Sequence, residues 1–384
     1  MFQPRPYQTE AINRALDFFR SNDKSNAIEI LPTGSGKSVV IANIAMGLEG
    51  KTIVFQPSKE ILEQNLKKFL SYGYRAGVYS ASAGSKFIDK ITFATIGSVI
   101  KKTHLFRDCK NIIIDECHLV NAKGGMYFDF TKSIPDAKVL GLTATPYRLA
   151  SNSFGAELRF ITRTNPRVFS KVLYYIQNEV LFNSGHLSKL EYFNFDVVNR
   201  TMLTVNSSGT DFTEASLRAY YRQIGMTGIA IGYANRLLAK RKNLLVFCSL
   251  LSEAREVASG IPGAVVIDGE MSKKEISEIQ SNFLSNKIRC VIAVGKWTTG
   301  FDKPDLECVL LVRSTMSLAL YYQMVGRAMR PHPGKESAWI VDLGGNIKFF
   351  GKIETMQIRV NERGLFSIWN NNRQLTNVPF QKAA

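Results

Sequence analysis

The stretch EILPTGSGKSVVIANIA, residues 29–45, combines three patterns that together decide the fold of this chain. Apolar and β-branched residues predict a strand that ends near Leu31, and the apolar spacing after Lys37 predicts a helix. Between them lies a short loop with Gly34 and Gly36, which tolerate backbone conformations that other residues avoid. A strand that leads into a helix through such a loop is typical of an α/β domain with a parallel sheet.

The same alternation continues on both sides of this stretch. Apolar runs alternate with helix-compatible segments, which indicates parallel sheets covered by helices. In the first part of the chain the runs are NAIEIL, KTIVFQ, KITFATI, NIIIDE and KVLGLTATP. In the second part they are NLLVFCS, AVVIDG, IRCVIAV, ECVLLVRS and SAWIVDL. The sequence therefore predicts two similar α/β lobes in tandem.

The domain boundaries follow from where this alternation stops. We predict a first lobe at residues 1–150, a linker that merges into the second lobe at 151–345, and a C-terminal extension at 346–384. The first part of the middle region contains turn signals such as NSG and NSSGTD but no clear hydrophobic period. The extension alternates apolar and polar residues around NERG and NNNR, which predicts a small β-hairpin or meander.

The loop in residues 29–45 has the features of a phosphate cradle. Its glycines let backbone amides face phosphate oxygens, and the positive end of the following helix attracts the same charge. Lys37 is expected to reach the β and γ phosphates of a nucleotide, and Ser38 to offer its hydroxyl to Mg²⁺. The full GxxxxGK[ST] pattern is not met, because Leu31 stands at its first position. The predicted nucleotide-binding loop residues are Thr33, Gly34, Ser35, Gly36, Lys37 and Ser38.

A second strand, NIIIDECHLV at residues 111–120, ends in Asp115, Glu116, Cys117 and His118. Cys and His are metal ligands, so a metal site is one interpretation. It is disfavoured, because the five cysteines are widely spaced without a CxxC pair and the chain has only four histidines. Beside a nucleotide loop, Asp115 would hold Mg²⁺ and Glu116 would polarise the attacking water. The alternative is that both acids merely cap the next element.

Length and composition limit the class of protein. A chain of 384 residues, with 45% hydrophobic residues, indicates two or three folded domains and argues against disorder. No apolar run approaches the roughly 18 residues of a membrane span, and a secretory signal is not evident, so we expect no membrane association and a cytoplasmic location. The net charge of +17 favours a polyanionic partner, first of all nucleic acid, over a merely soluble basic surface.

Several motifs together resemble a known family. PTGSGKS, DECH, GLTATPYRL and QMVGRAMRP, in this order, resemble superfamily II helicases and translocases across both lobes. RPYQ at residues 5–8, TTGFDKPD and VDLGGN add a resemblance to RadD-type bacterial DNA-repair helicases. That group carries a cysteine-rich zinc element after the second lobe, whereas this chain has no cysteine beyond Cys308. A shorter phage or prophage relative would fit this difference.

The resemblance implies two RecA-like lobes with ATP and Mg²⁺ as ligands, and it assigns roles to further residues. Gln8 would read the adenine edge with Arg5 or Tyr7 nearby, although Arg5 and Tyr7 could belong to an ordinary helix start after Pro6. Arg327 and Arg330 are three residues apart, which predicts one helix face, and they would act as arginine fingers rather than as a solvated basic face. Nucleotide state would be coupled to lobe closure through His118, Thr143 and Thr145, and the site would be completed by Gly300, Asp302 and Gln323.

The nucleic-acid contacts implied by the resemblance are hydroxyls and loop amides that grip phosphates and sugars without reading sequence. They are Pro57, Ser58, Lys59, Thr95, Ile96, Gly97 and Ser98 in the first lobe, and Ser249, Gly269, Thr298 and Thr299 in the second. Each could equally be an ordinary turn or cap residue. The motif VIDG has Asp268 where many relatives carry a histidine, which weakens the assignment of Gly269. The extension could either bind nucleic acid or pack on the second lobe.

These features predict an ATP-dependent helicase or translocase that acts on DNA rather than RNA, in repair, recombination or replication. We expect a monomer in a bacterial or phage-infected cell, with single-strand-binding or recombination proteins as possible partners. Two other classes remain open. A P-loop kinase for a small molecule would need no second-lobe arginines, and a nucleic-acid clamp would use ATP only as a conformational switch.

Overall fold

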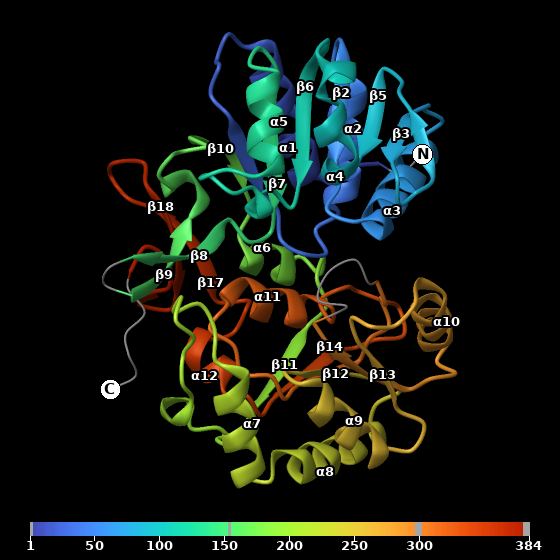
Figure 1. Cartoon of the computed structure of the whole chain (residues 1–384), viewed down its shortest axis with the longest axis vertical. Coiled ribbons are helices and arrows are strands. Elements are labelled where there is room, and N and C mark those ends of the chain that lie inside the picture. Colours follow the sequence, from blue (N-terminus) through green and yellow to red (C-terminus); the bar gives the residue numbers. More distant parts are fainter. Residues whose placement is uncertain (1–2, 153–154, 296–301, 379–384) are drawn as a thin grey trace. The chain divides into compact units, whose positions relative to one another are not determined.

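The computed structural model describes residues 3–152, 155–295 and 302–378 and consists of two compact units (Figure 1). The first unit comprises Met1–Arg148, Arg159–Gln177 and Val360–Phe366. The second comprises Leu149–Leu158, Asn178–Arg359 and Ser367–Ala384. The chain therefore passes between the two units more than once.

The first unit is built on an eight-stranded sheet with the order β10-β1-β7-β6-β2-β5-β3-β4. All neighbouring strands are parallel except the edge pair β3 and β4. The strands are β1 (Ala27–Ile30), β2 (Lys51–Phe55), β3 (Gly77–Ser80), β4 (Ser85–Phe87), β5 (Ile91–Ala94), β6 (Cys109–Asp115), β7 (Lys138–Thr143) and β10 (Lys171–Tyr175). The central strands are buried along their length, because helices cover both faces of a parallel sheet.

The helices of the first unit follow the strands in βα order. They are α1 (Pro6–Arg20), α2 (Lys37–Gly47), α3 (Lys59–Leu70), α4 (Ile96–Val99) and α5 (Met126–Ser133), with short 3₁₀ turns at Ile100–Phe106, Cys117–Leu119 and Ile161–Arg163. Helix α2 packs between α1 and α3. In a parallel sheet the carboxyl ends of the strands share one edge, so the loops after β1, β6 and β7 meet there.

The second unit contains a six-stranded, entirely parallel sheet with the order β11-β16-β15-β12-β14-β13. Its strands are β11 (Leu190–Asn194), β12 (Leu244–Cys248), β13 (Val265–Ile267), β14 (Cys290–Val294), β15 (Cys308–Leu311) and β16 (Ala338–Asp342). Its helices are α6 (Asn178–Asn183), α7 (Glu214–Gln223), α8 (Met226–Leu238), α9 (Leu251–Ser259), α10 (Lys273–Leu284), α11 (Leu318–Gly326) and α12 (Asn346–Phe350), with a 3₁₀ turn at Arg200–Met202.

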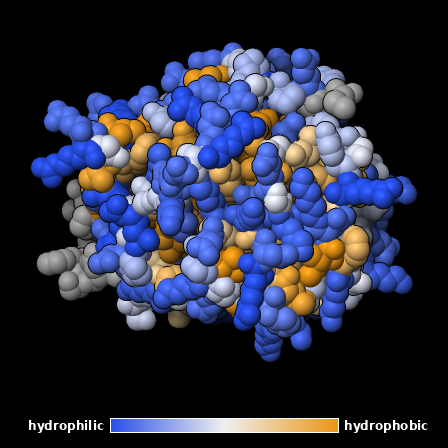
Figure 2. Space-filling model, turned by 90° about the horizontal axis from the view of Figure 1, so that it is seen from above, coloured by the Kyte–Doolittle hydropathy of each residue, from blue (hydrophilic) through white to orange (hydrophobic). Residues whose placement is uncertain are grey.

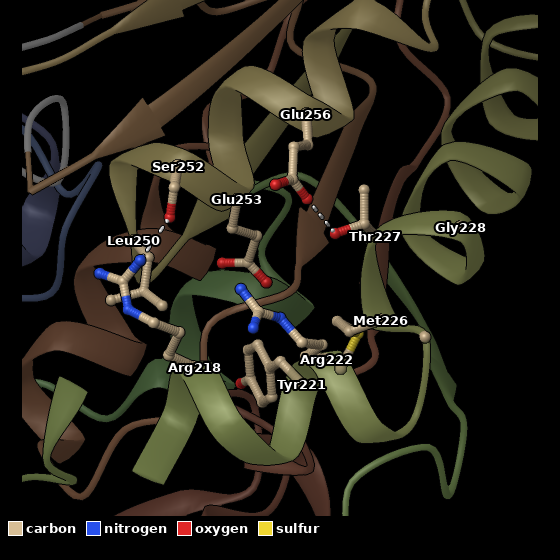
Figure 3. Close-up of a pocket in the computed structure, with 11 residues that line it drawn as sticks. Arg218, Tyr221, Arg222, Met226, Thr227, Gly228, Leu250, Ser252, Glu253 and Glu256 are labelled. Atoms are coloured by element: carbon tan, nitrogen blue, oxygen red, sulfur yellow. Dashed lines mark hydrogen bonds between the residues drawn. The ribbon is translucent and has the colours of Figure 1, made fainter. Parts of the chain in front are cut away.

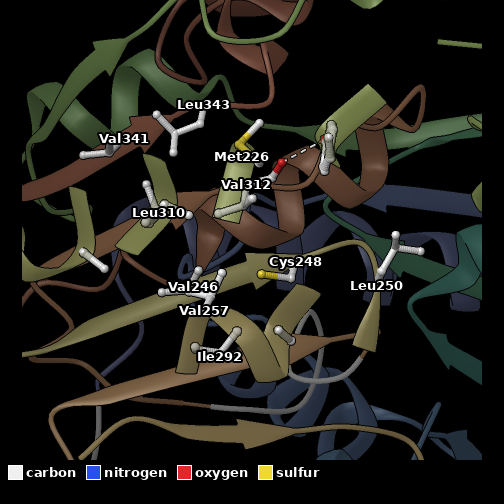
Figure 4. Packing of buried hydrophobic residues seen from close by; sticks show 14 of the residues in the cluster. Met226, Val246, Cys248, Leu250, Val257, Ile292, Leu310, Val312, Val341 and Leu343 are labelled. Carbon is white, nitrogen blue, oxygen red and sulfur yellow. Dashed lines mark hydrogen bonds between the residues drawn. The ribbon is translucent and has the colours of Figure 1, made fainter. Parts of the chain in front are cut away.

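The core of the second unit lies between its sheet and helices α8 and α9 (Figure 4). Val246 and Cys248 of β12, Ile292 of β14, Leu310 of β15 and Val257 of α9 belong to this cluster, and all five are at most 1% exposed. This burial explains why the corresponding stretches of sequence read as continuous apolar runs.

The predicted alternation of strands and helices is confirmed, since each of the ten apolar runs contains a strand. The region after residue 150 differs from the prediction of a linker that leads only into the second lobe. After the hairpin of β8 (Tyr147–Asn152) and β9 (Gly155–Phe160), the chain adds β10 to the first sheet by parallel pairing with β1. The backbone N–H and C=O groups on one side of β1 form hydrogen bonds with β10. A first domain that ended at residue 150 would leave these groups of β1 without partners.

The C-terminal extension forms a three-stranded sheet, as the predicted meander requires, of β17 (Met356–Val360), β18 (Phe366–Asn370) and β19 (Arg373–Gln374). The short helix α12 precedes it and was not predicted. Phe366 of this extension stacks on Phe160 with ring centroids 5.7 Å apart, and both residues belong to the first unit.

The surface is mainly polar. Figure 2 shows one face on which hydrophilic side chains dominate and hydrophobic side chains form small, scattered patches. Within the described parts of the chain, every helix is too short or too polar to span a lipid bilayer.

Candidate nucleotide site

The loop between β1 and α2 takes the conformation that its glycines predict. Gly34 and Gly36 have φ angles of +83° and +82°, in the left-handed region. A Cβ atom on Gly36 would lie 2.5 Å from Nε2 of Gln8, so a larger residue is excluded by contact as well as by conformation. Gly36 is also the N-cap of α2, and Lys37 and Ser38 begin that helix. The amides at this helix start can therefore face a phosphate group.

Side chains of helix α1 form hydrogen bonds with this loop. Tyr7 Oη and Gln8 Nε2 both donate hydrogen bonds to the carbonyl oxygen of Ser35, at 2.6 and 2.7 Å. The other end of the Gln8 amide, Oε1, accepts from the backbone N–H of Arg5 at 2.9 Å. Gln8 is only 2% exposed, so its side chain stabilises the loop. Its predicted contact with adenine stays a prediction, and that contact would compete with Ser35.

The acidic end of β6 lies opposite the loop. Glu116 Oε1 is 3.5 Å from Nζ of Lys37. Glu116 has φ +51° and ψ +49°, a left-handed conformation that is uncommon for a residue with a side chain. Such conformations cost about 1–3 kcal/mol and concentrate at functional sites. The structure thus brings together the predicted lysine and the predicted water-polarising carboxylate.

Asp115 is buried, with 4% exposure, and is held by two hydrogen bonds. Its Oδ1 accepts from the N–H of Glu116 at 3.0 Å, and its Oδ2 accepts from Nδ2 of Asn65 at 3.1 Å. Burial, together with the neighbouring charge of Glu116, raises the pKa of Asp115 to about 7. A positive ion beside these carboxylates would stabilise the charged form of Asp115 and so lower its pKa again.

Sequence reasoning missed Asn65 and its partner Gln56. Asn65 Nδ2 also donates to Gln56 Oε1 at 2.8 Å, so it links the end of β2 to the end of β6. A signal was present in the sequence, because Asn65 stands with Leu62 and Phe69 on the buried face of α3. A polar residue within such an apolar stripe indicates a buried hydrogen-bonding role.

The donor set fits Mg²⁺ rather than a softer metal. The candidate ligands, the hydroxyl of Ser38 and the carboxylate of Asp115, are hard oxygen donors, which Mg²⁺ prefers. Among the described residues, no group of three or more Asp, Glu, His and Cys side chains is arranged to hold a metal ion. Mg²⁺ also usually keeps waters and binds through one or two carboxylates plus substrate phosphates, which fits a small protein donor set.

The thiol and the imidazole of the DECH motif have separate structural tasks. His118 Nδ1 lies 2.9 Å from Oγ1 of Thr143 and 3.2 Å from Oγ1 of Thr145, so the structure brings these three residues together, and their coupling role stays a prediction. The same nitrogen lies 3.3 Å from Oε2 of Glu116, so the relay reaches the carboxylate beside Lys37. Cys117 is fully buried, and a Cβ atom on Gly141 would lie 2.6 Å from its sulfur. The small thiol therefore packs against the next strand.

The predicted arginines of the second unit follow α11 rather than lying on it. The helix ends at Gly326, Arg327 is its C-cap residue, and the next amides donate to carbonyls three residues back. The prediction of a shared helix face was wrong, because Pro331 disfavours helical backbone at Arg330 and the turn tightens before it. Both arginines remain half-buried.

Arg330 forms an ion pair with Asp302, which links two of the predicted motifs within the second unit. Burial lowers the pKa of Arg330 to about 10, and Asp302 Oδ1 is a buried oxygen without a hydrogen-bond partner in the structure. Gln323 is half-buried, and its backbone carbonyl accepts from Nε of Arg327 at 3.3 Å. The predicted residues Thr298, Thr299 and Gly300 lie outside the described residues.

Several predicted nucleic-acid contacts have local partners in the structure. Ser58 caps α3, where its Oγ accepts from the N–H of Ile61 at 3.3 Å, and Lys59 lies 3.3 Å from Glu63. Thr95 precedes α4 and its Oγ1 is 3.0 Å from Oγ of Ser98. These contacts are local ones within or beside short helices, so the nucleic-acid role of these residues stays a prediction.

Four further positions also stay predictions of nucleic-acid contact. Pro57 precedes the cap of α3, and Gly97 lies in α4 with open space where a side chain would be. In the second unit, Ser249 Oγ is buried without a partner, whereas its N–H donates to Glu253. Gly269 lies in a turn in which Asp268 Oδ1 accepts from the N–H groups of residues 270 and 271, at 2.8 and 3.2 Å.

Two family descriptions match the chain. Residues 1–148 match ResIII, the type III restriction enzyme res subunit, and residues 230–332 match Helicase_C, the helicase conserved C-terminal domain. The first match contains the loop of β1, the DECH motif and the threonines of β7, and the second contains α11 and Arg327. The sites described above therefore lie within the matched regions.

Relatives and solved structures agree with these matches. A 51.5 kDa protein of a Lactococcus phage (isolate 7-9) is 24% identical over 316 residues, which cover 81% of this chain and 64% of that protein. The ATP-dependent DNA helicase Q1 of Mus musculus is 23% identical over 353 residues, which cover 85% of this chain and 49% of that protein. The chain thus spans less than two thirds of the length of either relative.

The solved structure of the ATP-dependent Type ISP restriction-modification enzyme LlaBIII bound to DNA superposes with a TM-score of 0.67. The sequence identity is 17%, and the likeness covers 88% of this chain and 27% of that chain. At this identity the likeness concerns the fold alone, and it confirms the predicted pair of RecA-like lobes.

Proposed function

We propose that this chain, with the ResIII and Helicase_C domains of a superfamily II helicase, is an ATP-dependent motor that acts on nucleic acid. The observation that carries the proposal is the arrangement after β1 and β6. A glycine loop, the lysine that follows it and two carboxylates from a neighbouring loop converge within the first unit. These are the groups that hydrolysis of a nucleoside triphosphate needs.

The chemical roles follow from this geometry. Lys37 lies near Glu116 in the structure, and a triphosphate would draw the ammonium group toward its β and γ oxygens. Glu116 would then be released to orient and polarise the attacking water, with His118 holding its other oxygen.

Ser38 and Asp115 would hold Mg²⁺. When bound, this ion supplies positive charge that neutralises the β and γ phosphate oxygens. The chain's own contribution is to fix the carboxylate of Asp115 through Asn65 and through the N–H of Glu116. These hydrogen bonds would hold the carboxylate of Asp115 toward the ion, while the carboxylate of Glu116 would interact with the attacking water.

We assign Arg327 and Arg330 to the charge that develops on the transferred phosphoryl group. Arginine fingers contribute about 10³ to 10⁵ in rate. Arg330 is paired with Asp302 in the structure and would exchange this partner for a phosphate oxygen. Gly300 and Gln323 complete this part of the proposed site.

The net charge of +17 supports a nucleic-acid track, and we propose DNA rather than RNA, with a repair, recombination or replication role related to RadD-type helicases. The strand would be gripped by backbone contacts at Pro57, Ser58, Lys59, Thr95 and Gly97 and at Ser249, Gly269, Thr298 and Thr299.

The test is ATP turnover measured with single-stranded, duplex and forked DNA and with RNA, each across a salt series. We expect strong stimulation by at least one polynucleotide and its loss in Glu116→Gln, which should still bind ATP. The matched control is Glu278→Gln, an exposed glutamate on α10, which should keep full turnover. Wild-type turnover in Glu116→Gln would contradict the catalytic assignment.

The same assay separates the two other classes of function. A small-molecule kinase would show no stimulation by any polynucleotide. A clamp that uses ATP as a switch would hydrolyse about one ATP per binding event rather than many.

A further inference from the structure

A cavity of about 240 Å³ lies in the second unit, between the end of α7 and the first turns of α8 and α9 (Figure 3). It is smaller than the roughly 300–1,000 Å³ of sites for drug-sized ligands, so it suits one small chemical group. None of the motifs discussed above accounts for its polar lining.

The first unusual feature of this cavity is a buried carboxylate with one unused oxygen. Glu253 is 6% exposed, and its Oε2 accepts from the N–H of Ser249 at 3.2 Å. Its Oε1 is buried and has no hydrogen-bond partner in the structure. Since an unsatisfied buried acceptor costs about 1–3 kcal/mol, this oxygen indicates a missing N–H or O–H donor.

The second feature is an arginine that faces the same space. Figure 3 shows the guanidinium of Arg222 and the carboxylate of Glu253 directed into the cavity from α7 and α9. Arg222 lines the cavity and is exposed, so its guanidinium stands at the open side of this space. At the cavity's rim, Arg218 Nη1 donates to Oγ of Ser252 at 3.1 Å, close to the start of α9.

The remaining lining is apolar or already satisfied. Met226 and Leu250 are 0% and 5% exposed, and the hydroxyl of Tyr221 is hydrogen-bonded to the carbonyl of Val312 at 3.0 Å. Glu256 Oε2 accepts from Oγ1 of Thr227 at 3.2 Å. A simple anion would leave Glu253 unsatisfied, and a simple cation would meet two arginines. The occupant must therefore offer both donors and acceptors on a flat, partly apolar body.

We propose that this cavity binds one unstacked nucleotide, whose base donates to Glu253 Oε1 and accepts from Arg222 while its phosphate lies near Arg218. Nucleobases carry N–H donors beside ring acceptors on one edge, and arginine and glutamate pair with such edges. Arginine and a helix start are suited to the phosphate. The nucleotide comes either from a bound strand, in which case the inference rests on the proposed function, or from solution.

The experiment uses full-length protein and two variants, Arg222→Gln and Glu253→Gln. Their matched controls are Arg236→Gln on α8 and Glu278→Gln on α10, both exposed. Oligonucleotides with a single abasic position, moved along the strand, are compared with intact strands in equilibrium binding. If the nucleotide belongs to a bound strand, an abasic site at one position should weaken binding by the wild-type protein about tenfold. In both variants the affinity should no longer depend on the position of the abasic site.

A free nucleotide is tested by calorimetric titration with nucleoside monophosphates in a Lys37→Ala background, which disables the phosphate loop. Binding that falls about tenfold in both variants but not in the controls supports a soluble ligand. Mononucleotide binding without any polynucleotide binding would reject the proposed motor while retaining the cavity's role. Wild-type behaviour of both variants in both assays overturns the inference, and Arg222→Gln keeps the test decisive if Glu253→Gln fails to fold.

Discussion

Glu29 in the middle of β1 is a buried acid that no part of the proposed mechanism uses. It is 0% exposed, and both carboxylate oxygens lack hydrogen-bond partners in the structure. Burial raises the pKa of Glu29 well above its usual value, and the charge of Arg14 offsets this only partly. The folded state therefore holds a proton that the unfolded chain releases as the pH rises past the ordinary carboxyl range, so stability falls with increasing pH.

We predict that Glu29→Gln raises the free energy of unfolding at pH 8 by about 1–3 kcal/mol and has a much smaller effect near pH 4.5. Denaturant unfolding at several pH values measures this difference. Glu49→Gln, an exposed control, should change stability by less than about 0.5 kcal/mol at every pH. An equal gain at both pH values would show that ionisation of Glu29 is not the cause.

We assign His118 a positioning role in the proposed mechanism, because it contacts Glu116, Thr143 at the end of β7 and Thr145 after it. His118→Ala should retain ATP binding and lower the ratio of polynucleotide-stimulated to basal turnover about tenfold or more. His104→Ala, at a distant surface position, is the control. A variant that loses basal and stimulated turnover equally would point to a direct role in the chemistry.

Single residues also show what sequence can and cannot predict. Lys37, Asp115 and Glu116 are predictable, because the strand–loop–helix pattern and the acidic strand end define their chemistry locally. The polar character of Asn65 on a buried helix face indicates a hydrogen-bonding role, but its partner Asp115 is not predictable, because the two residues are fifty positions apart. The left-handed conformation of Glu116 is not predictable either, since nothing in its own side chain favours it.

At the scale of elements, the two arginines that follow α11 have different structural roles. Arg327 caps the helix, whereas Arg330 follows it and pairs with Asp302. Arg330→Ala would leave a partly buried carboxylate without its counter-charge, which typically costs about 1–3 kcal/mol. Arg327→Ala should cost about 1 kcal/mol or less.

We therefore predict that both variants lose ATP turnover but that only Arg330→Ala shows a clear fall in melting temperature. Thermal unfolding together with turnover measures the two effects separately. The double variant Arg330→Ala with Asp302→Ala should recover part of the stability without recovering turnover, because the orphaned carboxylate is removed. Equal melting temperatures for the two single variants would contradict the ion pair.

The elements also differ in how well sequence predicts them. The buried central strands were predicted, because a continuous β-branched run bounded by turn residues is typical of a strand covered on both faces. Strands β3, β4, β10 and β11 were not, because they lie at or near sheet edges and depend on pairing with residues distant in sequence. The helix at QMVGRAM ends earlier than predicted, because Pro331 disfavours helical backbone at the residue before it.

At the scale of the whole molecule, the charge of +17 makes a quantitative prediction about nucleic-acid binding. If about five lysines or arginines contact phosphates of a single strand, the logarithm of the binding constant should fall against the logarithm of salt with a slope near −3.5. Fluorescence anisotropy across a salt series measures it. A slope near zero would contradict the prediction that lysines and arginines of this chain bind nucleic-acid phosphates.

The pairing of β10 with β1 has a practical consequence for dividing this chain. A truncated protein that stops at residue 150 would present β1 as a bare sheet margin, a template for intermolecular strand addition. Such a product should precipitate or self-associate, whereas an expression boundary drawn after Gln177 restores the missing neighbour. Limited proteolysis in the β8–β9 hairpin should correspondingly give nicked chains that stay together rather than two separable halves.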